Sequence, residues 1–221
     1  MRRVSAIIVA AGEGKRFGSA KQFALLQGRP LLDWSLDKFE GHPDVDEIVV
    51  VLPDMKRKAA YLGPGRKVIA VVSGGPRRQD SVWKGVEALN PERADIVLVH
   101  DGVRPLVSRA LITRVIEETE RKGAAVPAVP VEETIKEVDG AWVVRTLDRG
   151  RLYRIQTPQG FLYPVLKKSL QRAREEGYSG TDEAVLLERT GQKVAVVAGD
   201  PRNIKITTTL DLKMAEVWLE S

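Results

Sequence analysis

Apolar runs rich in β-branched residues alternate along this chain with segments of helical periodicity. The apolar runs predict strands over 4–11, 47–52, 67–72, 96–100, 124–129 and 193–197. The periodic segments predict helices over 30–40, 54–62, 80–89, 108–121, 164–176, 181–189 and 208–219. Because strands and helices alternate, we expect an α/β fold with a mostly parallel sheet and helices on both faces. Ligands bind at the carboxyl ends of the strands in such a sheet.

One stretch departs from this alternation and predicts a projecting β-arm at about 131–154. Two short strand-like runs, 134–138 and 141–146, are joined there by Asp139-Gly140, a pair that favours a type I′ hairpin turn. An isolated hairpin is only marginally stable in water, so Trp142 and the valines after it need a packing partner. A second subunit is one candidate, and the hairpin's own domain is the other.

Length and composition indicate one domain, residues 1–221, with the arm as an insertion. A chain of 221 residues with 43% hydrophobic content buries a full core without staples. The absence of cysteine excludes disulfides, thiolate metal sites and a thiol nucleophile. No apolar run reaches membrane-spanning length, and a strand pattern rather than a signal peptide follows Met1-Arg-Arg. We therefore expect a cytoplasmic protein that does not bind membranes.

The charge balance points to a small anionic ligand rather than to nucleic acid. The net charge is +5 and the isoelectric point is near 9.4, but basic and acidic residues are interspersed along most of the chain. Aromatic residues make up only 5%, which disfavours a stacking surface for single strands. Nucleic-acid binding remains an alternative, and it predicts steeply salt-dependent affinity.

The loop after the first predicted strand combines glycines with cations in a way that suits polyphosphate. Glycines permit positive φ and let backbone N–H groups approach an anion, while lysine and arginine supply charge. The loop has neither the Gly-Lys-Ser/Thr ending of a P-loop nor the Gly-x-Gly-x-x-Gly spacing of a dinucleotide fingerprint. A tight turn with solvated lysines is the alternative. The residues concerned are Gly12, Gly14, Lys15, Arg16, Gly18 and Lys21.

A second glycine-containing segment, 74–81, follows the third predicted strand and leads into a helix. Backbone groups at Gly75 suit a base edge, and Arg78 and Ser81 suit polar groups of a nucleotide at the helix start. The alternative is that Asp80 or Ser81 simply caps the helix, and the two interpretations are compatible.

Asp101 emerges from a buried strand, since the residues before His100 are all apolar. A carboxylate opposite a triphosphate suits Mg²⁺ or another divalent cation, bound directly or through water. We interpret His100 as structural, because histidines at strand ends usually satisfy local hydrogen bonds.

Further cations and hydroxyls follow downstream, but no protein nucleophile is recognisable. Arg149 and its neighbours precede Thr157-Pro-Gln, and Lys205 lies before the last predicted helix. Thr181 starts a predicted helix, where a plain N-cap is the alternative to a role in the site. The chain has no Ser-His-Asp order, nucleophile elbow or histidine cluster. Phosphoryl and nucleotidyl transfer need none of these, because positioning, metal and charge neutralisation supply the catalysis. A phosphate-monoester acceptor is already ionised and needs no general base.

Taken in order, these motifs resemble the 2-C-methyl-D-erythritol 4-phosphate cytidylyltransferase family over essentially the whole chain. The matching pieces are Ala10-Ala-Gly-x-Gly-x-Arg16 with Lys21, Gly-Gly-x-x-Arg78-Gln-x-Ser81, His-Asp101-x-x-Arg104-Pro, Arg149, Thr157-Pro-Gln and Asn-Ile-Lys205-Ile-Thr. The resemblance implies a Rossmann-like homodimer that uses the arm as its interface. It also implies CTP and a polyol phosphate as substrates, Mg²⁺ as cofactor, and a place in non-mevalonate isoprenoid synthesis.

The resemblance also assigns roles to individual residues. Arg16 and Lys21 would stabilise the transition state at the α-phosphate, and Arg149 and Lys205 would position the acceptor phosphate. The implied CTP contacts are Ala10, Ala11, Gly12, Gly14, Arg16, Lys21, Gly75, Arg78 and Ser81. The implied acceptor contacts are Asp101, Arg104, Thr134, Arg149, Thr181 and Lys205, with Asp101 also near the metal and with Thr134 and Arg149 serving the partner's site.

Two other functions stay open on the residues alone. A ribitol-5-phosphate cytidylyltransferase would share the CTP site and differ only in the acceptor pocket. A non-catalytic nucleotide-binding regulatory module would need the triphosphate loop but not the distant cations Arg149 and Lys205. A hexose-1-phosphate nucleotidyltransferase fits less well, because the Arg-Gln-x-Ser and Thr-Pro-Gln segments do not suit it.

Overall fold

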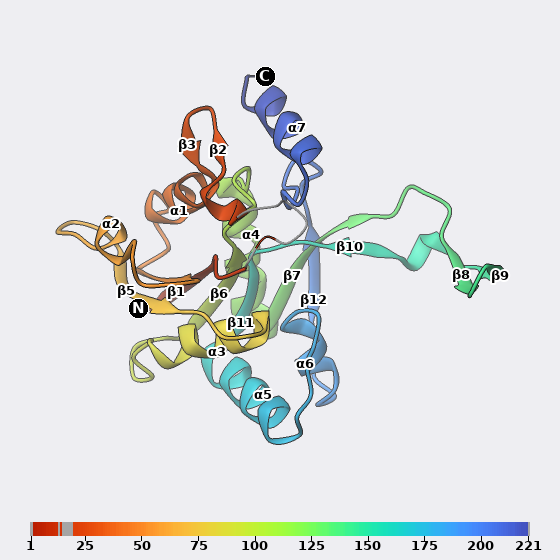
Figure 1. Cartoon of the computed structure of the whole chain (residues 1–221). Coiled ribbons are helices and arrows are strands. Elements are labelled where there is room, and N and C mark those ends of the chain that lie inside the picture. The colour runs from red at the N-terminus through yellow and green to blue at the C-terminus, as the bar shows by residue number, and fades with distance from the viewer. Residues whose placement is uncertain (1, 13, 15–19, 221) are drawn as a thin grey trace.

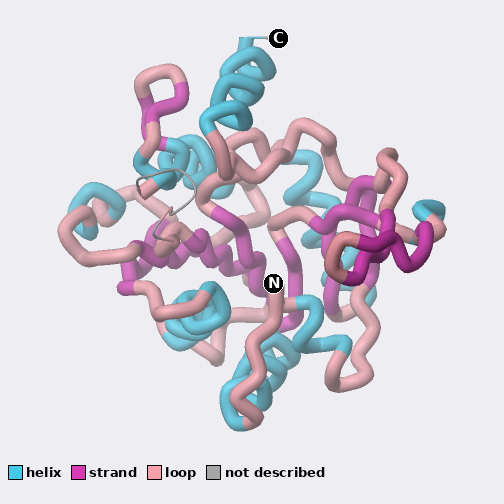
Figure 2. The backbone as a smooth tube through the Cα atoms, turned by 45° about the vertical axis from the view of Figure 1, so that its right-hand side comes forward, coloured by secondary structure: helices cyan, strands magenta, loops and turns pink. Residues whose placement is uncertain are grey.

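The structure is a computed structural model that describes residues 2–12, 14 and 20–220. Its centre is an eight-stranded sheet with the order β10-β7-β11-β6-β1-β4-β5, and β12 pairs with β7 in addition. Helices cover both faces of this sheet (Figure 1), and Figure 2 shows the strands running between the two helical layers. The predicted Rossmann-like, mostly parallel α/β fold is confirmed.

Parallel strands form the middle of the sheet. β1 (Val4–Val9) lies between β6 (Ile96–Asp101) and β4 (Glu47–Leu52), and β5 (Val68–Ser73) extends the sheet beyond β4. Side chains alternate between the faces along each strand. Both faces of the three inner strands are covered, which explains why their sequences are predominantly apolar.

The two faces build separate hydrophobic clusters. On one face, Ile8 of β1 packs in a cluster with α1 (Leu31–Glu40) and α4 (Arg109–Lys122). On the other face, Ile7 packs in a cluster with residues of three further helices. These are α3 (Arg78–Glu87), α5 (Tyr163–Glu175) and α6 (Ala184–Glu188). The adjacent residues of β1 thus anchor the two layers.

An antiparallel strand that the sequence pattern did not predict separates β6 from β7 (Ala124–Pro130). This strand, β11 (Gln159–Leu162), pairs antiparallel with both neighbours. β10 (Tyr153–Ile155) pairs with the end of β7, and β12 (Ala195–Ala198) runs parallel to the same strand. β7 therefore pairs with strands from distant parts of the chain.

The predicted hairpin arm is present as β8 (Lys136–Asp139) and β9 (Trp142–Thr146), which form a two-stranded sheet of their own. It projects from the body of the molecule (Figure 1). The predicted type I′ turn is wrong. Asp139 pairs with Trp142, and only Gly140 of the two loop residues has positive φ, at 55°. Positive φ at the first loop position alone is the pattern of a type II′ turn.

A type I′ turn occurs instead in a small hairpin that the pattern did not predict. β2 (Leu25–Leu26) and β3 (Arg29–Pro30) are joined by Gln27 and Gly28, whose φ angles are 47° and 78°. Positive φ at both loop residues defines this turn class. The 3₁₀ helix η1 (Lys21–Phe23), which carries Lys21, directly precedes this hairpin.

Two helices are shorter than predicted. The helix expected over 54–62 is confined to α2 (Lys58–Tyr61), because the Asp54 side chain accepts the Lys56 N–H and favours a turn. The helix expected over 181–189 begins only at Ala184, where Asp182 accepts the Val185 N–H.

The last helix, α7 (Thr209–Glu220), packs beside β2 and buries Ala215 in a small cluster with Leu26, Leu31, Val103 and Ile206. This cluster fixes the segment before α7, which carries Lys205. Within the part of the chain that the structure describes, no helix has both the length and the apolar character needed to span a bilayer.

Candidate active site

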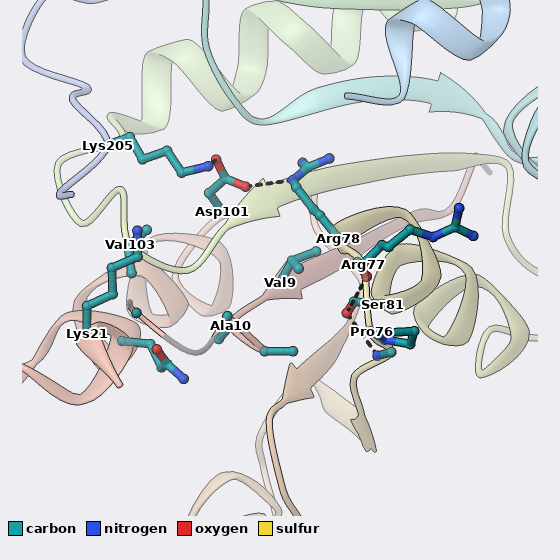
Figure 3. A pocket seen from close by; sticks show the side chains of 15 residues that line it. Val9, Ala10, Lys21, Pro76, Arg77, Arg78, Ser81, Asp101, Val103 and Lys205 are labelled. Carbon is teal, nitrogen blue, oxygen red and sulfur yellow. Dashed lines mark hydrogen bonds and ion pairs between the residues drawn. The ribbon is translucent and has the colours of Figure 1, made fainter. Parts of the chain in front are cut away.

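The segments after β1, β5 and β6 line one cavity of about 420 Å³ at the carboxyl edge of the sheet. A cavity of this size suits a small-molecule ligand. Figure 3 shows side chains from distant segments meeting in it. It brings together Ala10, Ala11, Gly12, Gly14, Lys21, Gly75, Arg78, Ser81, Asp101 and Lys205, all of which the sequence nominated.

The glycine-rich loop contributes to this cavity through its described residues. β1 ends at Val9, two residues earlier than predicted, and Gly14 has a φ of 69°. Lys21 on η1 returns to the cavity wall. Arg16, which the resemblance places at the transition state, lies outside the described residues, as do Lys15 and Gly18.

The segment after β5 approaches the first loop very closely. A Cβ added to Gly74 would lie 2.2 Å from the Ala11 Cβ, so only glycine lets the two loops meet. The Ser81 hydroxyl then accepts the Gly75 N–H at 3.1 Å and donates to the Arg77 carbonyl at 3.2 Å. This pairing fixes the turn that forms one wall of the cavity.

The capping interpretation of this segment is also confirmed. The Asp80 carboxylate accepts the Arg77 backbone N–H at 3.2 Å and forms a capping box at the start of α3. Asp80 therefore stabilises the helix start, while Ser81 holds the turn and faces the cavity.

Asp101 lies between cations that reach it from different segments, and Figure 3 shows Arg78 and Lys205 on either side of it. Its Oδ1 accepts the Arg78 Nε–H at 3.1 Å, and its Oδ2 lies 2.9 Å from Lys205 Nζ and 3.5 Å from Arg104 Nε. Burial alone would raise the pKa of Asp101, but Arg78, Lys205 and Arg104 hold it well below its ordinary value. Asp101 is therefore ionised at neutral pH.

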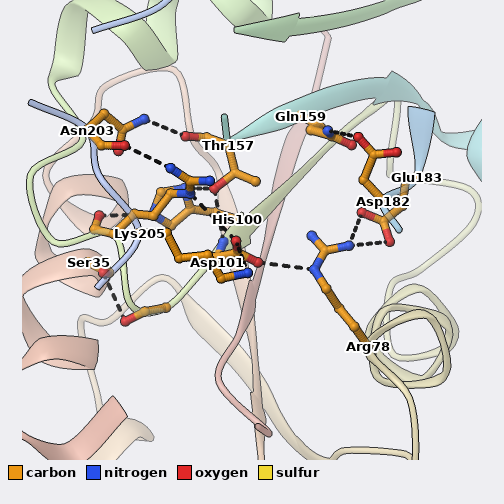
Figure 4. A network of polar contacts seen from close by, with 12 residues as sticks. Ser35, Arg78, His100, Asp101, Thr157, Gln159, Asp182, Glu183, Asn203 and Lys205 are labelled. Atoms are coloured by element: carbon orange, nitrogen blue, oxygen red, sulfur yellow. Dashed lines mark hydrogen bonds and ion pairs between the residues drawn. The ribbon is translucent and has the colours of Figure 1, made fainter. Parts of the chain in front are cut away.

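Arg78 has a second carboxylate partner that sequence reasoning missed. Its Nη1 donates to both oxygens of Glu183, at 2.8 and 2.7 Å, and the Glu183 side chain is only 1% exposed (Figure 4). Burial acts to lower the pKa of Arg78, but Glu183 and Asp101 together raise it above its ordinary value. The sequence offered no signal, because Glu183 lies far along the chain in what looked like a plain helix start.

A hydrogen-bond network behind Asp101 holds the end of β6 in place (Figure 4). The Thr157 hydroxyl accepts the Asp101 N–H and lies 3.1 Å from His100 Nδ1. His100 Nε2 lies 3.3 Å from the Arg104 carbonyl, which can only accept a proton. Burial lowers the pKa of His100 to about 3, so the neutral ring donates from Nε2 and accepts the Thr157 hydroxyl at Nδ1. The structural interpretation of His100 is confirmed.

The same network reaches the segment that carries Lys205. Asn203 Nδ2 donates to the Thr157 carbonyl at 2.8 Å, and Arg104 Nη1 donates to the Asn203 carbonyl at 2.8 Å. Arg104 thus borders Asp101 without lining the cavity itself. These bonds hold three distant segments of the chain in one arrangement.

The other predicted acceptor residues do not line this cavity. Thr134 is exposed at the base of the arm, and Arg149 on the 3₁₀ helix η2 (Arg149–Arg151) donates to the Glu132 carbonyl. Thr181 is exposed two residues before Glu183. Among the described residues, the cavity therefore contains the predicted CTP residues and Lys205, but not the arm residues.

The donor set fits a divalent cation that arrives with phosphate. The described residues contain no group of three or more His, Cys, Asp and Glu side chains that could hold a metal alone. Asp101 offers one ionised carboxylate, and Mg²⁺ commonly combines one or two carboxylates with phosphate oxygens and water. The surrounding cations disfavour a bare metal ion, whereas a triphosphate would supply the compensating negative charge.

A cavity rich in cations, with one ionised carboxylate and no nucleophile among its described residues, suits displacement at phosphorus by an oxygen that is already ionised. On a Rossmann-like sheet, this is the chemistry of a nucleotidyltransferase. Comparison with known proteins gives the particular family. A family model for IspD, 2-C-methyl-D-erythritol 4-phosphate cytidylyltransferase, matches residues 4–221, and the chain belongs to this family.

Individual relatives agree over nearly the full length. The cytidylyltransferase of Geotalea uraniireducens is 43% identical over 99% of this chain and 97% of its own, and that of Symbiobacterium thermophilum is 44% identical over 98% and 93%. The solved structure from Thermus thermophilus is 37% identical, with a TM-score of 0.83 and full coverage of both chains. The Francisella tularensis structure is 34% identical, with a TM-score of 0.85 over 97% of this chain and 99% of its own.

Proposed function

We infer that this chain transfers CMP from CTP to 2-C-methyl-D-erythritol 4-phosphate, giving 4-diphosphocytidyl-2-C-methyl-D-erythritol and pyrophosphate. The family match over residues 4–221 supports this reaction. The observation that best supports it is the 2.9 Å contact between Lys205 Nζ and Asp101 Oδ2 on the cavity wall, because a cation at this position could bind a second phosphate. A regulatory module that only bound nucleotide would have no use for that cation.

In this reaction the acceptor phosphate oxygen attacks the α-phosphorus of CTP, and the bond from that phosphorus to the bridging oxygen breaks. Negative charge moves onto the pyrophosphate. Lys21 and Arg16 meet this charge from the glycine-rich loop, as electrostatic stabilisation of phosphoryl transfer requires. Lys205 binds the acceptor phosphate and reduces its repulsion from the nucleotide.

The nucleoside binds on the other side of the cavity. The backbone of Ala10, Ala11 and Gly12 faces the ribose and phosphates, and Gly14 lets the loop turn toward them. Gly75, Arg78 and Ser81 line the cavity and would contact the cytidine. The close approach of Gly74 to Ala11 supports this assignment, because it makes one continuous wall from the two loops.

The family is one of nucleotidyltransferases, a class that generally uses a divalent metal. We propose that Mg²⁺ is held by Asp101, directly or through water, together with the phosphates of CTP. The metal would neutralise phosphate charge in the transition state. Arg78 and Lys205 keep the Asp101 carboxylate ionised and oriented for this task.

We propose that residues 1–221 form one nucleotidyltransferase domain that dimerises through the arm at 131–154. Trp142 is 81% exposed, and Val138, Val143 and Val144 are each more than half exposed. A cavity of about 600 Å³, which includes Tyr153 and Val196, adjoins the base of the arm. A second copy of the chain would cover both surfaces. The same arrangement gives Thr134 and Arg149 a role in the partner's site, with Asp101, Arg104 and Thr181 on the acceptor side.

Mixing two impaired variants tests this arrangement. Lys205→Ala and Arg149→Ala are each expected to retain about a hundredth of wild-type turnover or less alone. If Arg149 serves the partner's site, a heterodimer contains one intact site, so equal mixing by denaturation and refolding restores about a quarter of wild-type turnover. Absence of any recovery, with heterodimers verified by tagged subunits, would show that Arg149 serves its own chain.

The acceptor is tested by pyrophosphate release. Purified protein with CTP and Mg²⁺ should turn over methylerythritol phosphate in preference to ribitol 5-phosphate. Release with ribitol 5-phosphate alone would assign the related reaction instead. We also propose that the enzyme acts in the cytoplasm.

A further inference from the structure

A buried ion pair connects the nucleotide cavity to the loop 178–183. Arg78 is the first residue of α3, and its guanidinium extends from the cavity toward Glu183 (Figure 4). Its Nη1 holds both Glu183 oxygens while its Nε holds Asp101 at 3.1 Å. The guanidinium therefore spans two carboxylates on separate segments of the chain.

Three further contacts hold this loop against the same part of the fold. Gln79, next to Arg78, donates to the Tyr178 carbonyl at 3.1 Å and accepts the Gly180 N–H at 3.0 Å. Gln159 of β11 donates to Asp182 at 2.7 Å. Contacts from α3 and from β11 together therefore hold the loop that carries Glu183 in place.

Glu183 does not line the cavity, and no role for it follows from the nucleotide chemistry. Its side chain is 1% exposed, and a buried carboxylate is costly unless it is paired. Arg78 offsets this cost, because one of its nitrogens binds both Glu183 oxygens. Such a pair is often no more stabilising than apolar residues of similar volume, and in some proteins it serves to fix one specific arrangement.

We propose that Glu183 is a positioning residue that holds the Arg78 guanidinium on Asp101 and away from the phosphates of the nucleotide. The proposal rests on the CMP transfer inferred above. Arginine prefers phosphate oxygens as bidentate partners, and Arg78 lines the cavity that receives them. With Glu183 in place, Arg78 stays on the carboxylate. Without it, Arg78 turns to the triphosphate and Asp101 loses its fixed orientation.

The test is Glu183→Gln, which keeps the shape of the side chain and removes its charge. Turnover falls about tenfold or more, because Arg78 and Asp101 lose their fixed orientation and misplaced groups slow a reaction strongly. The KM for CTP does not rise, because Arg78 turns to the triphosphate and adds a contact to the bound nucleotide. The Arg78 Nε–Hε signal in a ¹H–¹⁵N spectrum of the substrate-free protein shifts or broadens. The matched control is Glu176→Gln, whose carboxylate pairs with Arg172 and Arg189 at the surface and which leaves all three readouts unchanged.

A second variant covers the case in which Glu183→Gln does not fold. Arg78→Lys keeps the charge but cannot bridge two carboxylates with one ammonium group. It gives the same loss of turnover in a protein that remains folded, as judged by circular dichroism. Turnover within about twofold of wild type in either folded variant, or an unchanged Arg78 signal in Glu183→Gln, overturns the proposal. A wild-type enzyme without pyrophosphate release would instead overturn the reaction and leave the spectroscopic test in force.

Discussion

Lys205 Nζ lies 2.9 Å from Asp101 Oδ2, although the two residues are far apart in the sequence. Asp101 ends β6, and Lys205 belongs to the segment just before α7. If Lys205 binds the acceptor as proposed, its ammonium group would be shared between the Asp101 carboxylate and the incoming phosphate. Substitutions at Lys205 and at the other residues around Asp101 therefore test the site directly.

Lys205→Ala removes the cation that we propose binds the acceptor phosphate. Turnover should fall about a hundredfold, as loss of one preorganised electrostatic contact usually does. Steady-state pyrophosphate release measures the effect. Lys213→Ala on the exposed side of α7 is the control and should leave turnover unchanged. Turnover within about threefold of wild type in Lys205→Ala would remove Lys205 from the mechanism.

Lys21→Ala tests the glycine-rich loop. The substitution should lower turnover about a hundredfold or more, because the charge that develops on pyrophosphate loses a partner. Single-turnover kinetics with both CTP and acceptor present measure the CMP-transfer step separately from substrate binding. Lys56→Ala, at an exposed position before α2, is the comparison and should behave as wild type. Near-normal turnover in Lys21→Ala would contradict the assigned role.

Thr157→Val tests the network behind Asp101. It leaves the Asp101 N–H and His100 Nδ1 without their partner in a buried setting. Unfolding free energy should fall by about 1–3 kcal/mol, measured by urea denaturation. Thr157→Ser keeps the hydroxyl and should recover most of this loss. Equal stabilities for the valine and serine variants would show that the hydroxyl does not hold the network together.

The two histidines predict a dependence of stability on pH. His42 and His100 are both buried, and burial lowers the pKa of each in the folded state, for His100 to about 3. His100 of the unfolded chain takes up a proton near pH 6.5, whereas the folded ring stays neutral down to about pH 3. The stability from His100 is complete above about pH 6.5 and is lost as the pH falls, by about 1.4 kcal/mol per pH unit, and His42 acts in the same direction.

Urea denaturation at about pH 7.5 and about pH 5.5, on either side of the ordinary histidine pKa, measures that loss. The imidazole signal of His100 in the folded protein should not titrate between these two pH values. A folded-state midpoint near 6.5 for His100 would show that its ring takes up a proton in the fold as readily as in the unfolded chain.

The arm predicts a specific effect on assembly. Trp142→Glu combined with Val144→Glu should shift the protein from dimer to monomer in sedimentation experiments, because the charges prevent burial of this surface. Leu210→Glu with Val217→Glu provides the matched control on α7, where the apolar side chains are 64% and 63% exposed. The control should keep the dimer. An identical response in both pairs would mean that the arm has no special part in assembly.

The parallel part of the fold was predictable because buried strands leave a clear pattern. β1, β4 and β6 are apolar runs, and their covered faces explain why. The convergence of Gly12, Gly75 and Asp101 at one edge followed from the parallel arrangement alone. Local chemistry at strand ends was therefore sufficient to locate the cavity.

The parts that were missed depend on contacts between distant segments. β11 has only four residues, and its pairing with β6 and β7 defines it more than its own sequence does. Glu183 looked like part of a helix start, because nothing near it in the sequence signals a partner as distant as Arg78. The turn of the arm was misassigned because Asp-Gly can occupy different positions of a hairpin loop.

The segment from Tyr153 to Leu162 has a consequence for how the enzyme responds to assembly. It leaves the arm as β10, passes Thr157, and enters the centre of the sheet as β11. A neighbouring molecule that bound the arm would therefore hold the same segment that carries the Thr157 hydroxyl, which accepts the Asp101 N–H. Only a few residues therefore separate the root of the arm from the hydroxyl that holds the Asp101 backbone.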